Sequence, residues 1–138
     1  AIESKAALNL FYRNVVRQGG NLEEMQKKRG SWRSEYSMEI RADKDGYIAS
    51  IDALKIGLAG VYLGVGRNRT EDSVSPTAGF IFDKKSGYHV SKGERIATLF
   101  GKDSQSLEAA FPLALNAISI ENTAPSISSL ILEEITVS

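Results

Sequence analysis

The spacing of apolar residues changes near residue 35, from the period of a helix to the alternation of a strand. Before that point the apolar residues fall on one helical face: Leu8, Phe11, Tyr12 and Val15. We expect Ser4 to cap the start of this helix, because a serine hydroxyl can accept from an early backbone N–H. Gly19 and Gly20 should end it in left-handed geometry, and Asn21 should cap a further short helical turn.

After residue 35 the pattern predicts two strands and a helix. Apolar residues alternate with polar ones in the first strand: Tyr36, Met38, Ile40 and Ala42. A turn over residues 43–46 leads to a second strand over residues 47–51. Asp52 is expected to cap a helix that Gly64 and Gly66 end. The apolar residues of that helix form one continuous stripe: Leu54, Leu58, Val61, Tyr62 and Val65.

Two more strands are expected on either side of a polar turn in the segment that follows, over residues 78–83 and 95–100. Gly87 and Gly93 suit tight bends in that turn, because glycine tolerates left-handed backbone geometry. Val90 and Ile96 are expected in a small β core.

A last helix is expected over residues 104–120, opened by Asp103 or Ser104. Pro112 lies inside this helix and should kink it or split it. Residues 130–137 predict a closing strand. Because helices and strands mix without a βαβ repeat, the fold class expected is α+β.

Polarity rises through residues 26–34, which read QKKRGSWRS, so this stretch is the best candidate for a domain boundary. We therefore expect residues 1–34 to be a helical segment that belongs to an upstream domain or to a linker. Residues 35–138 are expected to form the main domain.

Composition excludes several classes of function. Seventeen basic side chains balance seventeen acidic ones, so no electrostatic footprint for nucleic acid or an anionic membrane is present. No apolar run is long enough to span a bilayer. The chain has no cysteine, which excludes disulfides, thiolate metal ligands and a cysteine nucleophile. Absence of cysteine fits a reducing cytoplasm, where we expect the protein to be located.

The polar turn in residues 84–100 is similar to one in carrier domains that hold biotin or lipoate, which raises the question of whether Lys55 carries such a group. A modified lysine must lie at an exposed hairpin tip, whereas Lys55 lies in the first turn of the helix that Asp52 caps. We therefore expect no prosthetic-group attachment at Lys55.

No complete catalytic or metal site can be assembled from the other candidates. The GVGRNR stretch over residues 64–69 follows a helix rather than a strand, so a helix end explains it better than a dinucleotide fingerprint. His89 is the single histidine and is expected at the surface. Glu133 and Glu134 are adjacent in an expected strand and would point to opposite faces. The acidic pairs Asp43–Asp45 and Glu71–Asp72 are expected to be solvated loop carboxylates.

Residues from Gly46 onward resemble the C-terminal domain of the pyrimidine-nucleoside and thymidine phosphorylases. The residues that carry the resemblance are Gly46, Tyr47, Ile48, Ile51, Asp52, Leu63, Gly64, Gly66, Arg67, Glu71, Asp72, Ala78, Gly79, Gly87, Val90, Gly93, Ile96 and Ala97. The first helix resembles the one that precedes this domain in the same enzymes. One departure is Ser75, where family members often carry aspartate.

The resemblance implies an α/β-hammerhead fold, related in its β turns to the biotinyl/lipoyl domains. It also implies an enzyme, as a full-length protein, for reversible phosphorolysis of pyrimidine nucleosides to base and pentose 1-phosphate. Phosphate is then a co-substrate, no cofactor is expected, and family members are usually homodimers. The alternative is a stand-alone binding or scaffold domain with the same fold.

In the family, upstream residues hold phosphate and base, and their motifs do not occur in these 138 residues. No catalytic residue can therefore be carried over, and the upstream catalytic domains are the expected partners. The resemblance also suggests that the loop over residues 64–76 closes toward the substrate cleft. Arg67 and Arg69 are the candidate lid residues, although plain solvated loop charges explain them equally well.

Overall fold

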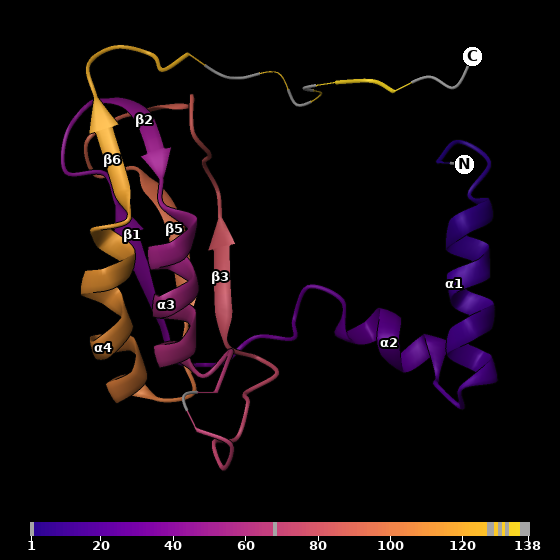
Figure 1. Ribbon diagram of the computed structural model, residues 1–138. Helices are drawn as coiled ribbons and strands as arrows, with labels where there is room; N and C mark the ends of the chain where they lie inside the picture. The colour runs from indigo at the N-terminus through magenta and orange to yellow at the C-terminus, as the bar shows by residue number, and fades with distance from the viewer. Residues whose placement is uncertain (1, 68, 127–128, 130, 132, 136–138) are drawn as a thin grey trace. The chain divides into compact units, whose positions relative to one another are not determined.

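The computed structural model describes residues 2–67, 69–126, 129, 131 and 133–135. The chain divides into two compact units, Ala1–Arg33 and Ser34–Ser138, which are described separately below (Figure 1). Among the described residues, no helix combines the length and apolar character that crossing a membrane requires.

The first unit consists of helices α1 (Ala6–Arg17) and α2 (Leu22–Lys28). Asn21 caps α2 as expected, since its side chain accepts from the Glu24 N–H at 3.1 Å. The expectation that Ser4 is the N-cap of α1 is wrong, because Lys5 holds that position with a φ of 53°. The Ser4 hydroxyl instead accepts from the Ala6 N–H at 3.4 Å. Neither helix contains a buried residue, so this unit has no core of its own.

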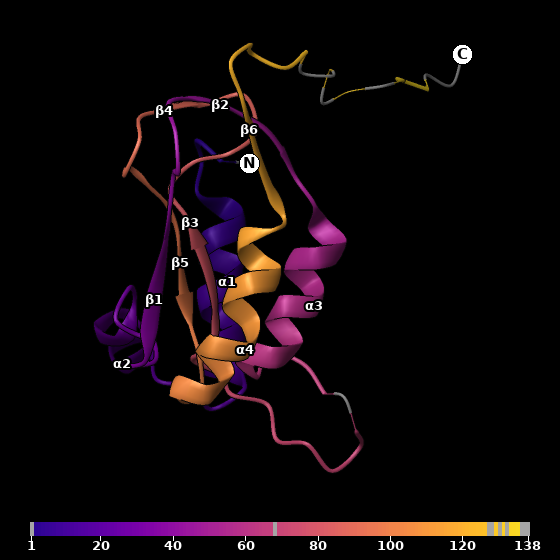
Figure 2. The same cartoon turned by 90° about the vertical axis from the view of Figure 1, so that its left-hand side faces the viewer.

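The second unit is α+β, as the sequence predicts. Its described strands form two three-stranded antiparallel sheets, in the orders β1-β5-β3 and β4-β2-β6. The strands are β1 (Ser37–Arg41), β2 (Gly46–Ile51), β3 (Gly79–Phe82), β4 (His89–Val90), β5 (Arg95–Phe100) and β6 (Ile118–Glu121). Helices α3 (Ala53–Leu63) and α4 (Ser104–Leu115) lie side by side and cover one face of β1-β5-β3 (Figures 1 and 2).

The core lies between that face and the two helices. Antiparallel pairing places Met38 and Phe80 on either side of Leu99, so their side chains share the inner face. The hydrophobic core cluster contains Ile40, Ala42, Ile48, Ala59, Leu63, Val90, Ile96, Leu99, Leu107, Ala110 and Ala114. Burial of Val90 and Ile96 confirms the small β core expected from the sequence.

The helix expected over residues 104–120 is too long. α4 ends at Leu115, and residues 118–121 form β6, which pairs with β2. The alternating isoleucines Ile118 and Ile120 pack against the core as a strand, a pattern that a helix would break. Pro112 does not split α4, which is continuous across it.

The closing strand expected over residues 130–137 is not observed where the structure describes that stretch. Residues 131 and 133–135 are outside any strand, and the other four lie outside the described residues.

The apolar stripe predicted on the helix that Asp52 caps is largely exposed. Leu54, Leu58 and Tyr62 are 72%, 50% and 49% exposed, and Val65, which is 45% exposed, lies beyond the last residue of α3. The buried residues of α3 are Ala59, Gly60 and Leu63, and the buried side of α4 contributes Ala110 and Ala114. Gly60 faces Phe80 of β3, and small residues on both helices let α3 and α4 pack closely together over the sheet.

Charged residues on the open side of the β1-β5-β3 sheet are linked through Arg95. Its guanidinium bonds Asp83 at 2.7 Å and Glu39 at 3.2 Å, and Arg41 forms a second ion pair with Glu39. The hydrogen bond from Arg95 is the main reason that the pKa of Glu39 lies below its ordinary value. Hydrogen bonds to Asp83 and Glu39 in turn raise the pKa of Arg95.

This linkage predicts a pH dependence. Because its pKa is lowered in the folded chain, Glu39 binds fewer protons there than in the unfolded chain just below pH 4.5. Its contribution to stability is complete above that pH and is lost as the pH falls through the lowered pKa. Arg95→Gln should therefore reduce stability most at pH 7, with a difference from wild type that narrows toward pH 2. Urea unfolding at both pH values measures this.

The matched control is Lys85→Gln, which removes the same charge from an exposed lysine for which no ion pair is described. The prediction is contradicted if the loss in free energy of unfolding caused by Arg95→Gln is the same at pH 7 and at pH 2.

Backbone geometry at Gly46 gives a second prediction. Gly46 has a φ of 153°, and a Cβ there would lie 2.6 Å from the Glu121 carbonyl oxygen. Gly46→Ala should lower the free energy of unfolding by about 2 kcal/mol or more, because strain and the clash with β6 add. Gly57→Ala is the control, since no atom lies within 4 Å of its Cβ position. Within a helix that change should stabilise by about 0.5–1 kcal/mol. Equal effects in thermal unfolding would contradict the prediction.

Candidate functional site

The loop over residues 64–76 leaves the end of α3 and returns to the same place. Gly64 ends the helix with a φ of 102°, as expected. The Ser75 N–H donates to the Gly64 carbonyl at 2.8 Å, which closes the base of the loop. The Lys102 N–H donates to the Leu63 carbonyl at 3.0 Å, and the Lys102 side chain packs against Gly64. The base is therefore fixed to two elements of the second unit.

The loop encloses a polar hollow of ≈ 430 Å³ next to this base. Its described lining residues are Val61, Tyr62, Gly64, Gly66, Glu71, Asp72, Ser73 and Lys102. Asp72 also orders the loop, because its carboxylate accepts from the Arg69 N–H at 2.9 Å. The lining thus includes two acidic residues and one lysine, which gives the hollow a polar character.

Arg67 and Arg69, the candidate lid residues, are both exposed, and neither is among the described lining residues of the hollow. The structure instead brings Lys102 to the loop, a residue that sequence reasoning missed. Thirty residues separate Lys102 from Asp72, and the packing of the turn after β5 against the end of α3 is what joins them. No short motif could have shown this proximity.

Ser75 is hydrogen-bonded at the base of this loop. In addition to its backbone bond to Gly64, its hydroxyl lies 3.3 Å from that of Thr77. These contacts hold the segment that leads to β3 beside the end of α3.

Lys55 lies in the first turn of α3, as expected, and Asp52 accepts from its N–H at 3.1 Å. Its ammonium lies 3.3 Å from the Asn116 carbonyl oxygen, so the side chain lies against the helix ends rather than at a hairpin tip. Gly87 and Gly93 have positive φ angles, which confirms the tight bends of the turn that resembles a carrier domain.

The remaining candidates do not assemble into a site. His89 is exposed, as expected, and its ring meets that of Tyr47 edge to face at 5.0 Å. Asp45 accepts from the Lys92 N–H at 3.0 Å and so holds a turn. Glu133 and Glu134 are exposed and outside any strand. The described part of the chain contains no group of three or more acidic or histidine side chains that could hold a metal ion.

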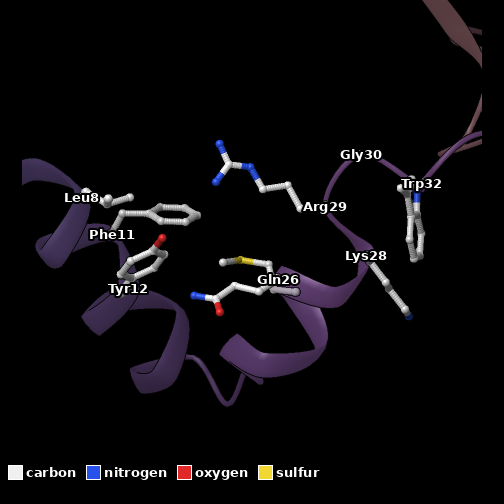
Figure 3. Close-up of a pocket in the computed structure, with 9 residues that line it drawn as sticks. Leu8, Phe11, Tyr12, Gln26, Lys28, Arg29, Gly30 and Trp32 are labelled. Atoms are coloured by element: carbon white, nitrogen blue, oxygen red, sulfur yellow. The ribbon is translucent and has the colours of Figure 1, made fainter.

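The first unit has a groove of its own, of ≈ 550 Å³, between its two helices. Figure 3 shows Phe11 and Tyr12 of α1 facing Gln26 of α2. Its described lining residues are Leu8, Phe11, Tyr12, Met25, Gln26, Lys28, Arg29, Gly30 and Trp32. The Lys28 ammonium lies 4.8 Å from the centre of the Trp32 ring. This groove is mainly apolar, which suits a protein surface better than a charged substrate.

The chain is similar to known proteins over most of its length. A pyrimidine nucleoside phosphorylase C-terminal domain model matches residues 47–121, which include β2, α3, the 64–76 loop, α4 and β6.

Curated relatives extend the match into the first unit. A pyrimidine-nucleoside phosphorylase from Staphylococcus epidermidis is 35% identical over 136 residues, covering 97% of this chain and 31% of the relative. A thymidine phosphorylase from Metamycoplasma hominis is 34% identical over 99 residues, 72% of this chain and 36% of the relative. A pyrimidine-nucleoside phosphorylase from Geobacillus stearothermophilus is 30% identical over 76% of this chain and 24% of its own length.

The chain thus spans only about a quarter to a third of the length of these relatives. The resemblance of the sequence to the C-terminal domain of these phosphorylases rests largely on glycines and on Asp52. The α+β architecture and the match over residues 47–121 both agree with it. The chain belongs to the pyrimidine nucleoside phosphorylase family, and the region of the family that it represents is the C-terminal domain.

Proposed function

We propose that the chain is the C-terminal part of a longer protein that catalyses reversible phosphorolysis of pyrimidine nucleosides. The observation that carries this proposal is the alignment, which covers nearly all of this chain and less than a third of the Staphylococcus epidermidis relative. Phosphate attacks the anomeric carbon in this reaction, and the base leaves. Phosphate is the co-substrate, and the reaction needs no cofactor.

Within the proposal, this chain has a supporting part in the reaction. The resemblance places the residues that hold phosphate and base upstream, so transition-state stabilisation is expected from the upstream part of the longer protein. Within the proposal, the second unit is a scaffold that positions the 64–76 loop.

We propose that this loop acts as a lid in the longer protein. Its base is fixed by the Ser75–Gly64 hydrogen bond, whereas Arg67 and Arg69 are exposed at its outer part. Fixed ends and an exposed polar tip suit a segment that closes on a ligand at low free-energy cost. An arginine at the tip could bond a phosphate group on closure.

The partners follow from the same proposal. The first unit buries no residue in either helix and has an apolar groove between them, so the upstream catalytic domain of the same polypeptide is its expected occupant. The longer protein is expected to be a homodimer in the cytoplasm.

The 138-residue chain alone should have no phosphorolysis activity, whereas the full-length polypeptide should turn over at about 1 per second or faster, as ordinary enzymes do. Release of free base from thymidine or uridine with phosphate measures both. Turnover at that rate by the short chain would refute the assignment of the sites to upstream residues. If a folded full-length polypeptide shows no turnover, the proposal that it is a phosphorylase is refuted. The alternative, a binding or scaffold domain, is then favoured.

The lid gives a further prediction. Arg67→Ala in the full-length polypeptide should lower kcat/KM about ten-fold, the effect of losing one hydrogen bond to a charged group. Lys92→Ala is the control, since this exposed lysine lies in the turn between β4 and β5. In the short chain, trypsin should cut the second unit first after Arg67 or Arg69. A loop as resistant as the core strands, with unchanged kinetics for Arg67→Ala, would rule out the lid.

A further inference from the structure

Three large apolar residues of α3 are exposed and lie on one side of the helix. We define the α3 stripe as Leu54, Leu58 and Tyr62, which recur every four residues. Figure 2 shows α3 at the outer edge of the layer that it forms with α4. Each of the three residues is about half exposed or more.

The composition of α3 indicates a helix covered on both sides. Its eleven residues, ALKIGLAGVYL, include one charged side chain, Lys55. A surface helix ordinarily has a charged or polar face opposite its buried one, and a helix that is apolar all round is buried. The buried side of α3 accounts for Ala59, Gly60 and Leu63. The α3 stripe is thus a second apolar side, and nothing in the described second unit covers it.

The exposed side of α3 also allows another surface to approach the helix backbone closely. Gly57 lies between Leu54 and Leu58 on the exposed side, and no atom lies within 4 Å of the position where its Cβ would be. A glycine costs stability within a helix, by about 1 kcal/mol relative to alanine. An adjoining surface that contacts the helix backbone would explain this glycine, whereas solvent would not.

We infer that the α3 stripe is the surface on which the N-terminal part of the same polypeptide docks. The inference rests on the proposed function, because it requires the longer chain. About two thirds of the length of the Staphylococcus epidermidis relative lies outside the match. A covalently tethered partner has an effective concentration in the millimolar range, so it occupies an apolar surface before a second copy does at micromolar protein. The occupant is accordingly an apolar surface without charged residues at its centre.

Side-chain footprinting with hydroxyl radicals tests the inference without any substitution. Labelling of Leu54, Leu58 and Tyr62 is compared between the 138-residue chain and the full-length polypeptide. All three should be labelled readily in the short chain and protected several-fold in the long one. Ile81 is the control, because it is 36% exposed and pairs across the sheet with Thr98, on the face opposite Met38 and Leu99.

Two results would overturn the inference. Equal labelling of the α3 stripe in both chains would show that the upstream part does not cover it. Protection already present in the short chain would assign the cover to this chain itself or to a second copy, which sedimentation would separate.

A double substitution provides an independent arm. Leu58→Lys/Tyr62→Lys should leave the unfolding midpoint of the short chain nearly unchanged, since both side chains are already half exposed. In the full-length polypeptide it should restore labelling at Leu54. A full-length polypeptide with a protected stripe but no phosphorolysis would refute the proposed function alone, and an active one with a fully labelled stripe would refute this inference alone.

Discussion

Close contact between α3 and α4 determines the arrangement of the second unit. Ala59 on one helix and Ala110 and Ala114 on the other are fully buried, and side chains of this size let the two helix backbones approach each other. Both helices then cover the inner face of β1-β5-β3, where Ile40 and Leu99 are buried. Larger residues at these three positions would disturb the packing of the core.

This contact has consequences at both ends of α3. At its start, Asp52 caps the helix directly after β2, and the Asp52 N–H bonds the Ala117 carbonyl ahead of β6. At its end, Gly64 receives the hydrogen bond from Ser75 and packs against Lys102. The 64–76 loop is therefore attached at the buried end of α3. A loop with a fixed base and an exposed tip suits the lid that we propose.

Local signals predicted most of the fold because the residues responsible are adjacent in sequence. Asp52 and Asn21 cap their helices through bonds to residues three positions away, and Gly64 has the positive φ that a helix end favours. The failures have non-local causes. Whether residues 118–121 form a helix or a strand depends on pairing with β2, some seventy residues earlier. The exposed side of α3 could not be predicted either, since a stripe of large apolar residues ordinarily marks the buried face.

The same distinction applies to the candidate site. Exposure of Arg67, Arg69 and His89 was expected from their polar surroundings, and it is observed. Proximity of Lys102 to Glu71 and Asp72 is a tertiary contact and has no local signature. The phosphate and base motifs that the resemblance implies have no counterpart in these 138 residues, so the sequence identifies no catalytic residue.

Our central claim is that the second unit contains the buried core of the described chain, whereas the helices of the first unit contribute nothing to it. Hydrogen exchange of backbone amides in the 138-residue chain tests this claim most directly. We predict that β5 and α4 exchange only through global unfolding, because they contribute the buried core. The amides of α1 and α2 should exchange orders of magnitude faster, since neither helix buries a residue. Protection of α1 and α2 equal to that of β5 and α4 would contradict the account.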